Sequence, residues 1–71
     1  LEHQIFMYAA QLGSISAVAR KIGKDPGNLS RILTRLENLH GGALFSRHQG
    51  GLRLNPAGEK LYQSLIKATE A

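Results

Sequence analysis

Apolar residues recur every three or four positions along the first dozen residues, as they do on one face of an amphipathic helix. The positions that follow this spacing are Leu1, Ile5, Phe6, Ala9 and Leu12. Gly13 comes directly after them, where helices commonly end. The pattern predicts a first helix over residues 1–12 that supports the rest of the fold.

A second, shorter helix is predicted after Gly13. Either Ser14 or Ser16 can serve as its N-cap, and Gly23 closes it. Its apolar side consists of Ala17, Val18, Ala19 and Ile22. Because most of these side chains are small, we expect another helix to pack closely against this one.

The third helix begins with Asp25 as N-cap and Pro26 at its first position, where a missing N–H costs nothing. Its apolar positions are Leu29, Ile32, Leu33, Leu36 and Leu39. The opposite strip, with its flanking residues, consists of Gly27, Asn28, Ser30, Arg31, Thr34, Arg35 and Asn38. This strip carries hydrogen-bonding and cationic groups and almost no acid, as a helix that lies on DNA should. The second and third helices predict a helix-turn-helix over residues 16–39.

Two short apolar-rich runs, at residues 43–47 and 52–54, flank a turn that contains glycine and predict a hairpin, or wing, over residues 43–54. Asn55 and Pro56 then start a final helix that extends to residue 71. Its apolar side consists of Leu61, Tyr62, Leu65 and Ile66. The predicted class is therefore mainly α, a winged helix-turn-helix with a three-helix core, a two-stranded wing and a C-terminal helix.

Basic charge is concentrated in the middle of the chain. The 71 residues carry a formal charge of +4, and the sequence pI is near 10.0. From Arg20 to Arg53 there are seven basic residues against two acidic ones, a net +5, whereas the flanks sum to −1. This distribution places the charge on the helix-turn-helix and the wing and points to a polyanionic partner such as DNA.

Length and composition argue against several other classes. One small domain leaves little room for an enclosed substrate pocket, and no catalytic set of residues shows a sensible spacing, so we do not expect an enzyme. The chain has no cysteine, and its histidines, His3, His40 and His48, lack the paired spacing of a metal site. No apolar run approaches the length of a membrane span. We therefore expect a cytoplasmic protein without a metal or cofactor.

The residues from 6 to 58 resemble, without a gap, the DNA-binding domain of LysR-type transcriptional regulators. The matching residues are Phe6, Gly13, Ser14, Ile15, Ser16, Ala17, Ala19, Gly23, Ser30, Leu36, Glu37, Gly41, Leu44, Phe45, Arg47, Leu54, Ala57 and Gly58. The resemblance implies a dimeric bacterial regulator with its third helix in the major groove and its wing on the adjacent minor groove. It also implies a C-terminal effector-binding domain beyond this chain, through which a small molecule would act. The chain, which starts without methionine, is expected to be a fragment.

The departures from the family pattern fall where DNA sequence would be read. Pro26 and Gly27 stand where the family often has glutamine and proline, so Asn28 and Ser30 must supply more of any direct readout. Gly50 stands where family wings often carry an arginine, so either Arg53 or His48 takes that role or binding in the minor groove is weak. His40 replaces a usual leucine, which predicts a looser or more exposed corner.

The candidate DNA-binding residues are Asn28, Ser30, Arg31, Thr34, Arg35, Arg47 and Arg53. Arg20, Lys21 and Lys24 form either an ordinary solvated helix face or a source of long-range attraction. The candidate dimer residues are Tyr62, Leu65 and Ile66, which either close the core or begin a dimer seam. If these three instead dock another protein, the chain is a winged-helix interaction module without DNA binding, but the acid-free face around Arg31 and Arg35 argues against this alternative.

Overall fold

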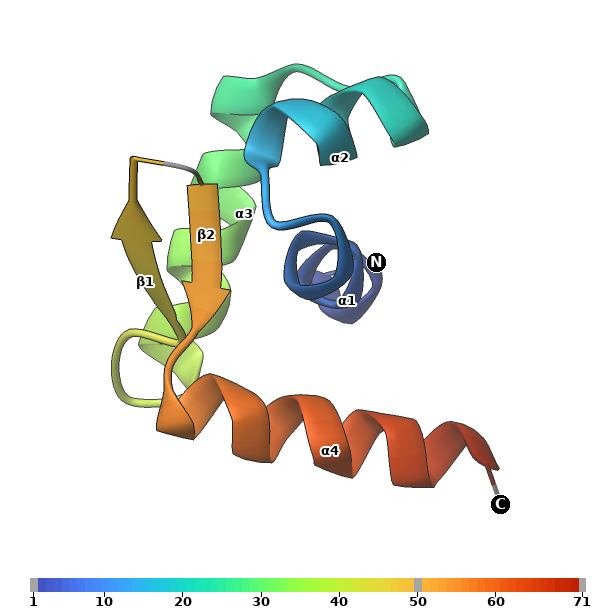
Figure 1. Cartoon of the computed structure of the whole chain (residues 1–71), viewed down its shortest axis with the longest axis vertical. Coiled ribbons are helices and arrows are strands. Elements are labelled where there is room, and N and C mark those ends of the chain that lie inside the picture. Colours follow the sequence, from blue (N-terminus) through green and yellow to red (C-terminus); the bar gives the residue numbers. More distant parts are fainter. Residues whose placement is uncertain (1, 50, 71) are drawn as a thin grey trace.

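The computed structural model describes residues 2–49 and 51–70, except for the side chains of residues 69 and 70. The elements, in chain order, are α1 (Glu2–Leu12), α2 (Ile15–Ile22), α3 (Pro26–Leu39), β1 (Phe45–His48), β2 (Gly51–Leu54) and α4 (Pro56–Glu70). Helices α1, α2 and α3 pack together, the hairpin lies along one side, and α4 runs below α1 (Figure 1). The predicted winged helix-turn-helix is confirmed. The expectations for Leu1, Gly50 and residue 71 lie outside the described residues.

The helix ends follow from local capping chemistry. Ser14, and not Ser16, is the N-cap of α2, because its hydroxyl accepts a hydrogen bond from the Ala17 N–H at 3.3 Å. Gly23 ends this helix in the left-handed region at φ 71°, and its N–H donates to the Ala19 carbonyl at 2.8 Å. The Asp25 carboxylate accepts from the Asn28 N–H at 3.2 Å and starts α3 as predicted.

Among the described residues, nine buried side chains form a core that holds the helices to the base of the hairpin. The buried residues are Ile5, Phe6, Ala9, Val18, Ala19, Leu29, Leu33, Leu36 and Leu44. The expectation for Leu39 is wrong, because its side chain is 71% exposed. Successive residues of a helix turn by about 100°, so Leu39, ten residues after Leu29, points about 80° away from it. Leu12, also expected on an apolar face, is 43% exposed at the last residue of α1.

The hairpin is antiparallel, and its strands pair Phe45 with Leu54 at the base and His48 with Gly51 near the tip. Its first strand begins two residues later than predicted. The preceding backbone is engaged elsewhere, since the Ala43 carbonyl accepts from Asn55 Nδ2 at 2.7 Å. The Leu52 N–H donates to the Gly13 carbonyl at 2.8 Å, which joins β2 to the loop between α1 and α2.

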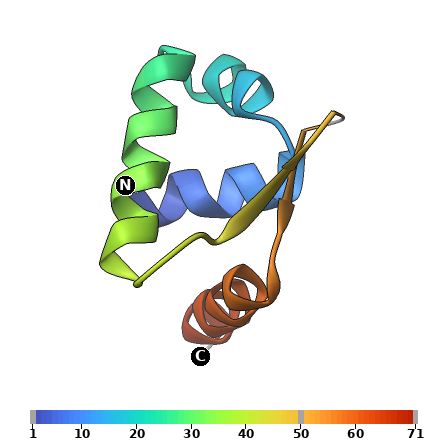
Figure 2. The same cartoon turned by 90° about the vertical axis from the view of Figure 1, so that its left-hand side faces the viewer.

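Helix α4 is attached to the core at its start and along one side. Asn55 caps it by accepting from the Gly58 N–H at 2.8 Å. Leu61, Tyr62 and Leu65 are partly buried and pack against the core. Figure 2 shows α4 end-on below α1, with α3 at the opposite edge of the molecule from the hairpin. None of the described helices is long and apolar enough to cross a membrane.

Candidate nucleic-acid interface

The outer side of α3 presents most of the predicted DNA-binding residues to solvent. Asn28, Arg31, Thr34 and Arg35 are exposed, whereas Ser30 is half-buried. The helix forms one edge of the molecule, so its outer side is open to a large partner (Figure 2). A major groove about 12 Å wide admits an α-helix, which is about 10–12 Å across with its side chains. The geometry therefore brings these residues onto one accessible surface.

The two arginines of α3 differ in their surroundings. Arg35 Nη1 lies 3.8 Å from the Glu2 carboxylate of α1, and its side chain is 70% exposed. An exposed pair at this distance contributes little to stability, but it offsets part of the Arg35 charge. Among the described residues, no carboxylate lies within ion-pair distance of Arg31. Arg31 therefore offers the less compensated positive charge.

The hydroxyls of α3 are less available than the sequence suggested. Thr34 Oγ1 donates to the Ser30 carbonyl one turn earlier at 3.0 Å. This bond occupies the hydroxyl proton of Thr34 and leaves its oxygen as an acceptor. Because Ser30 is also half-buried, the fully accessible donors of the first turns are Asn28 and Arg31.

The hairpin separates the two arginines of the wing. Arg47 pairs with Leu52, whereas Arg53 pairs with Ser46, and residues of neighbouring pairs point to opposite faces of the ladder. Arg47 lines a hollow with Ser14 and Ser16 at the start of α2, while Arg53 lines another with Leu12. The sequence placed both arginines in one role, but the structure does not bring them together.

Glu37, for which the sequence pattern predicted no role, connects the third helix to the wing. One carboxylate oxygen of Glu37, half-buried in α3, accepts from the Leu44 N–H at 2.8 Å and from the Phe45 N–H at 3.3 Å. These two hydrogen bonds hold the backbone at the start of β1 against α3. The signal in the sequence was a single acid inside an otherwise acid-free helix. Glu37 therefore fixes the wing relative to α3.

We expect Glu37→Ala to lower the free energy of unfolding by about 1–3 kcal/mol, because two part-buried N–H groups lose their acceptor. Glu37→Gln keeps one carbonyl oxygen and should lose less. Urea denaturation of the two variants measures the difference. If Glu37→Ala were as stable as the unsubstituted chain, the carboxylate would not hold the wing.

Two of the three histidines lie close together although the sequence separates them. The rings of His3, in α1, and His40, at the end of α3, have centroids 6.3 Å apart and are nearly perpendicular. His40 is exposed, as its departure from the family pattern predicted. Among the described residues no group of three or more potential ligands is placed to hold a metal ion. A pair supplies fewer than the three protein ligands usual at zinc sites.

The predicted dimer residues share the side of α4 that faces the protein. The hydroxyl of Tyr62 accepts from Gln11 Nε2 at 3.3 Å, and its ring centroid lies 6.5 Å from that of Phe6. Leu65 packs against the core, and Ile66 is half-buried. Tyr62 therefore contributes to the fold of its own chain, whatever it does in an assembly.

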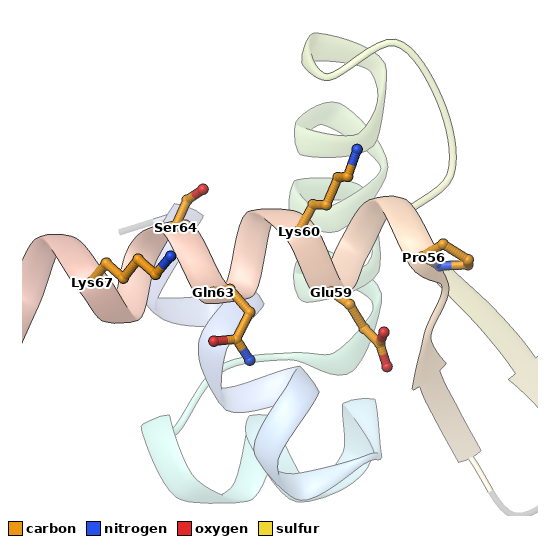
Figure 3. A pocket seen from close by; sticks show the side chains of 6 residues that line it. All are labelled: Pro56, Glu59, Lys60, Gln63, Ser64 and Lys67. Carbon is orange, nitrogen blue, oxygen red and sulfur yellow. The ribbon is translucent and has the colours of Figure 1, made fainter.

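The outer side of α4 is polar. An open hollow of about 490 Å³ runs along it, lined by Pro56, Glu59, Lys60, Gln63, Ser64 and Lys67. Figure 3 shows these side chains spread along a single helix. The surface mixes both signs of charge, which contrasts with the acid-free strip of α3.

Comparison with known proteins places this geometry in a family. The pattern described as "Bacterial regulatory helix-turn-helix protein, lysR family" matches residues 2–59. The probable HTH-type transcriptional regulator LtrA of Klebsiella pneumoniae is 42% identical over 67 residues, which are 94% of this chain and 22% of LtrA. The chain thus spans about a fifth of the length of this curated relative.

Solved structures show the same architecture. The BenM DNA-binding domain in complex with benA site 1 DNA matches with a TM-score of 0.87 at 26% identity, over 97% of this chain and 80% of that chain. CbnR, a LysR family transcriptional regulator, matches in fold with a TM-score of 0.87 at 23% identity, over 97% of this chain and 24% of CbnR. The chain therefore belongs to the lysR family of bacterial regulatory proteins, and it forms the winged helix-turn-helix DNA-binding domain of that family.

Proposed function

We propose that the domain binds double-stranded DNA with α3 in the major groove and the hairpin near the adjacent minor groove, as part of a bacterial transcription regulator in the cytoplasm. The observation that carries this proposal is the acid-free outer side of α3. The one acid within the helix, Glu37, is turned toward the wing and bonded to Leu44 and Phe45. The positive charge of α3 is therefore presented without an acidic neighbour on the same strip.

Exposure and bonding suggest a division of roles. Asn28 and Arg31 contact base edges, since an asparagine can pair with adenine and an arginine with guanine. Arg35, partly offset by Glu2, binds phosphate. Ser30 and Thr34 add weaker polar contacts, because their groups are half-buried or already bonded.

The two wing arginines have separate tasks. Arg47 lies on the face toward the start of α2 and contacts the DNA backbone. Arg53 lies on the opposite face and contributes mainly by long-range attraction. We expect the wing to add affinity and little sequence preference.

The test is the salt dependence of binding to a fluorescent random-sequence duplex. Each phosphate contact steepens the fall of log K with log salt by about 0.9. We expect the double variant Arg31→Ala, Arg35→Ala to bind more weakly and to have a slope shallower by about 0.9–1.8. The matched control, Lys60→Ala with Lys67→Ala, removes the same charge from the outer side of α4 and should leave the slope unchanged.

Two outcomes would contradict the proposal. An equal loss in both double variants would mean that only the net charge matters and that α3 is not the contact surface. No binding by the unsubstituted domain, even at low salt, would favour a winged-helix protein-interaction module. The packing of Tyr62 and Leu65 against their own core already leaves such a module less apolar surface on α4.

We further propose that the domain acts as a homodimer and as a binding module, without catalysis. The exposed parts of Leu65 and Ile66, both half-buried, lie at the end of α4 where a seam with a second copy would continue. Two recognition helices would then meet half-sites about 34 Å apart, or a multiple of this distance. Any small-molecule effector would act through a further domain, since the chain spans 22% of LtrA.

A further inference from the structure

Leu12 is one of two large hydrophobic residues that are exposed among the described side chains; the other is Leu39. It lies between two open hollows. One, of about 300 Å³, is lined by Leu12, Ala17, Arg20 and Lys21. The other, of about 250 Å³, is lined by Leu12, Gly13, His48, Gly51, Leu52 and Arg53. An aliphatic side chain thus stands at the centre of a surface built from α1, α2 and the wing.

Cations surround this leucine, and no acid lines either hollow in the described part of the chain. Arg20 and Lys21 form the rim on the α2 side, and Arg53 forms it on the wing side. None of the three has a carboxylate within ion-pair distance among the described residues. The Lys21 ammonium lies 5.4 Å from the centre of the Tyr8 ring, which is one helical turn before Leu12 in α1.

The surface lies apart from the outer side of α3. In Figure 2, α3 forms the left edge, whereas the end of α1 meets the hairpin at the right. Figure 1 shows the same arrangement from the front, where the end of α1 and strand β2 lie before α3. No residue of α3 lines either hollow. A duplex seated on α3, with the Arg47 face of the hairpin beside it, would therefore leave the hollow formed by Leu12, Ala17, Arg20 and Lys21 accessible.

We propose that Leu12, Ala17, Arg20, Lys21 and Arg53, here called the Leu12 patch, dock an acidic protein segment that carries an aliphatic side chain. The aliphatic group packs on Leu12 and Ala17, and the flanking carboxylates face the three cations. An exposed apolar centre with a polar rim is the usual anatomy of a protein contact. A phosphate backbone would use the cations but would gain little from the leucine. The domain would thus bind a second macromolecule while it is on DNA.

The probe is a capped peptide with two leucines between glutamates, and its control is the same peptide with serines in place of the leucines. Binding is followed by two-dimensional NMR of the labelled domain, first free and then saturated with duplex DNA. Leu12→Ser is compared with Leu39→Ser, which changes the other exposed leucine. Arg20→Ala with Lys21→Ala is compared with Lys60→Ala and Lys67→Ala. Far-UV circular dichroism confirms that each variant is folded.

We expect saturable binding of the leucine peptide, with shifts at the patch, both with and without DNA. Leu12→Ser and the Arg20, Lys21 double variant should each weaken it about tenfold, while their controls change it little. Equal binding of the serine peptide, or equal loss in Leu39→Ser, would overturn the proposal, as would the absence of binding. Displacement of the peptide by the duplex would assign the patch to the DNA interface instead.

Discussion

Replacing Phe6 by alanine should lower the free energy of unfolding by about 3–5 kcal/mol. The Phe6 side chain is fully buried, and its ring centroid lies 5.4 Å from that of Phe45 and 6.5 Å from that of Tyr62. It therefore joins α1 to both the wing and α4. A domain of this length has a total stability of roughly 4–11 kcal/mol by the usual value per residue. Phe6→Ala should thus remove a large share of this stability.

Urea denaturation followed by circular dichroism measures this loss. Phe6→Leu is the matched variant, since it keeps an apolar side chain of moderate size and should lose clearly less. Duplex binding by Phe6→Ala should fall in proportion to the folded fraction, with the salt slope of the remaining binding unchanged. A stability within about 1 kcal/mol of the unsubstituted domain would show that the space around Phe6 collapses, and that the wing and α4 do not depend on this ring.

Local chemistry explains why the helices could be predicted so closely. Asp25 and Pro26 start α3, and Gly23 ends α2, because each residue satisfies a requirement of the backbone within its own turn. The buried positions of α3 follow from its 3.6-residue period up to Leu36. Beyond Leu36 the rotation of about 100° per residue turns Leu39 away from the core. The prediction for Leu39 was wrong because it counted the spacing of apolar residues and did not follow this rotation.

The candidate site depends on contacts between residues that are far apart in the sequence, and the sequence pattern did not predict these contacts. The bonds of Glu37 to the start of the wing span seven and eight residues, and the approach of His3 to His40 joins the two ends of the helical core. Arg47 and Arg53 lie on opposite faces because of the register in which the two strands pair. The sequence pattern of two such short strands does not determine that register. The exposed positions on the outer side of α3 could be predicted because helical periodicity alone determines which side chains face away from the core.

Gly58→Ala should destabilise the domain by about 3 kcal/mol or more. Gly58 is buried in the first turn of α4, and an added Cβ would lie 2.1 Å from the Leu44 carbonyl oxygen and 2.9 Å from a methyl carbon of Leu54. The first neighbour is backbone, so the strain cannot be relieved by a side-chain rotation and α4 must move away from the hairpin. Overpacking of this kind typically costs about 1–3 kcal/mol, and a backbone clash belongs at the upper end.

The experiment isolates the clash because alanine is otherwise the better helix residue. Inside α4 the change should by itself stabilise the domain by about 0.5–1 kcal/mol, so the measured loss is a lower limit on the cost of the contact. Gly42→Ala is the control, since a Cβ there meets nothing within 4 Å and the residue does not have a positive φ. It should leave stability unchanged or raise it by about 0.4–1 kcal/mol. If urea denaturation gave Gly58→Ala the same stability as Gly42→Ala, α4 would not pack on the Leu44 carbonyl. In that case the match of this glycine to the family pattern would need a reason other than close approach.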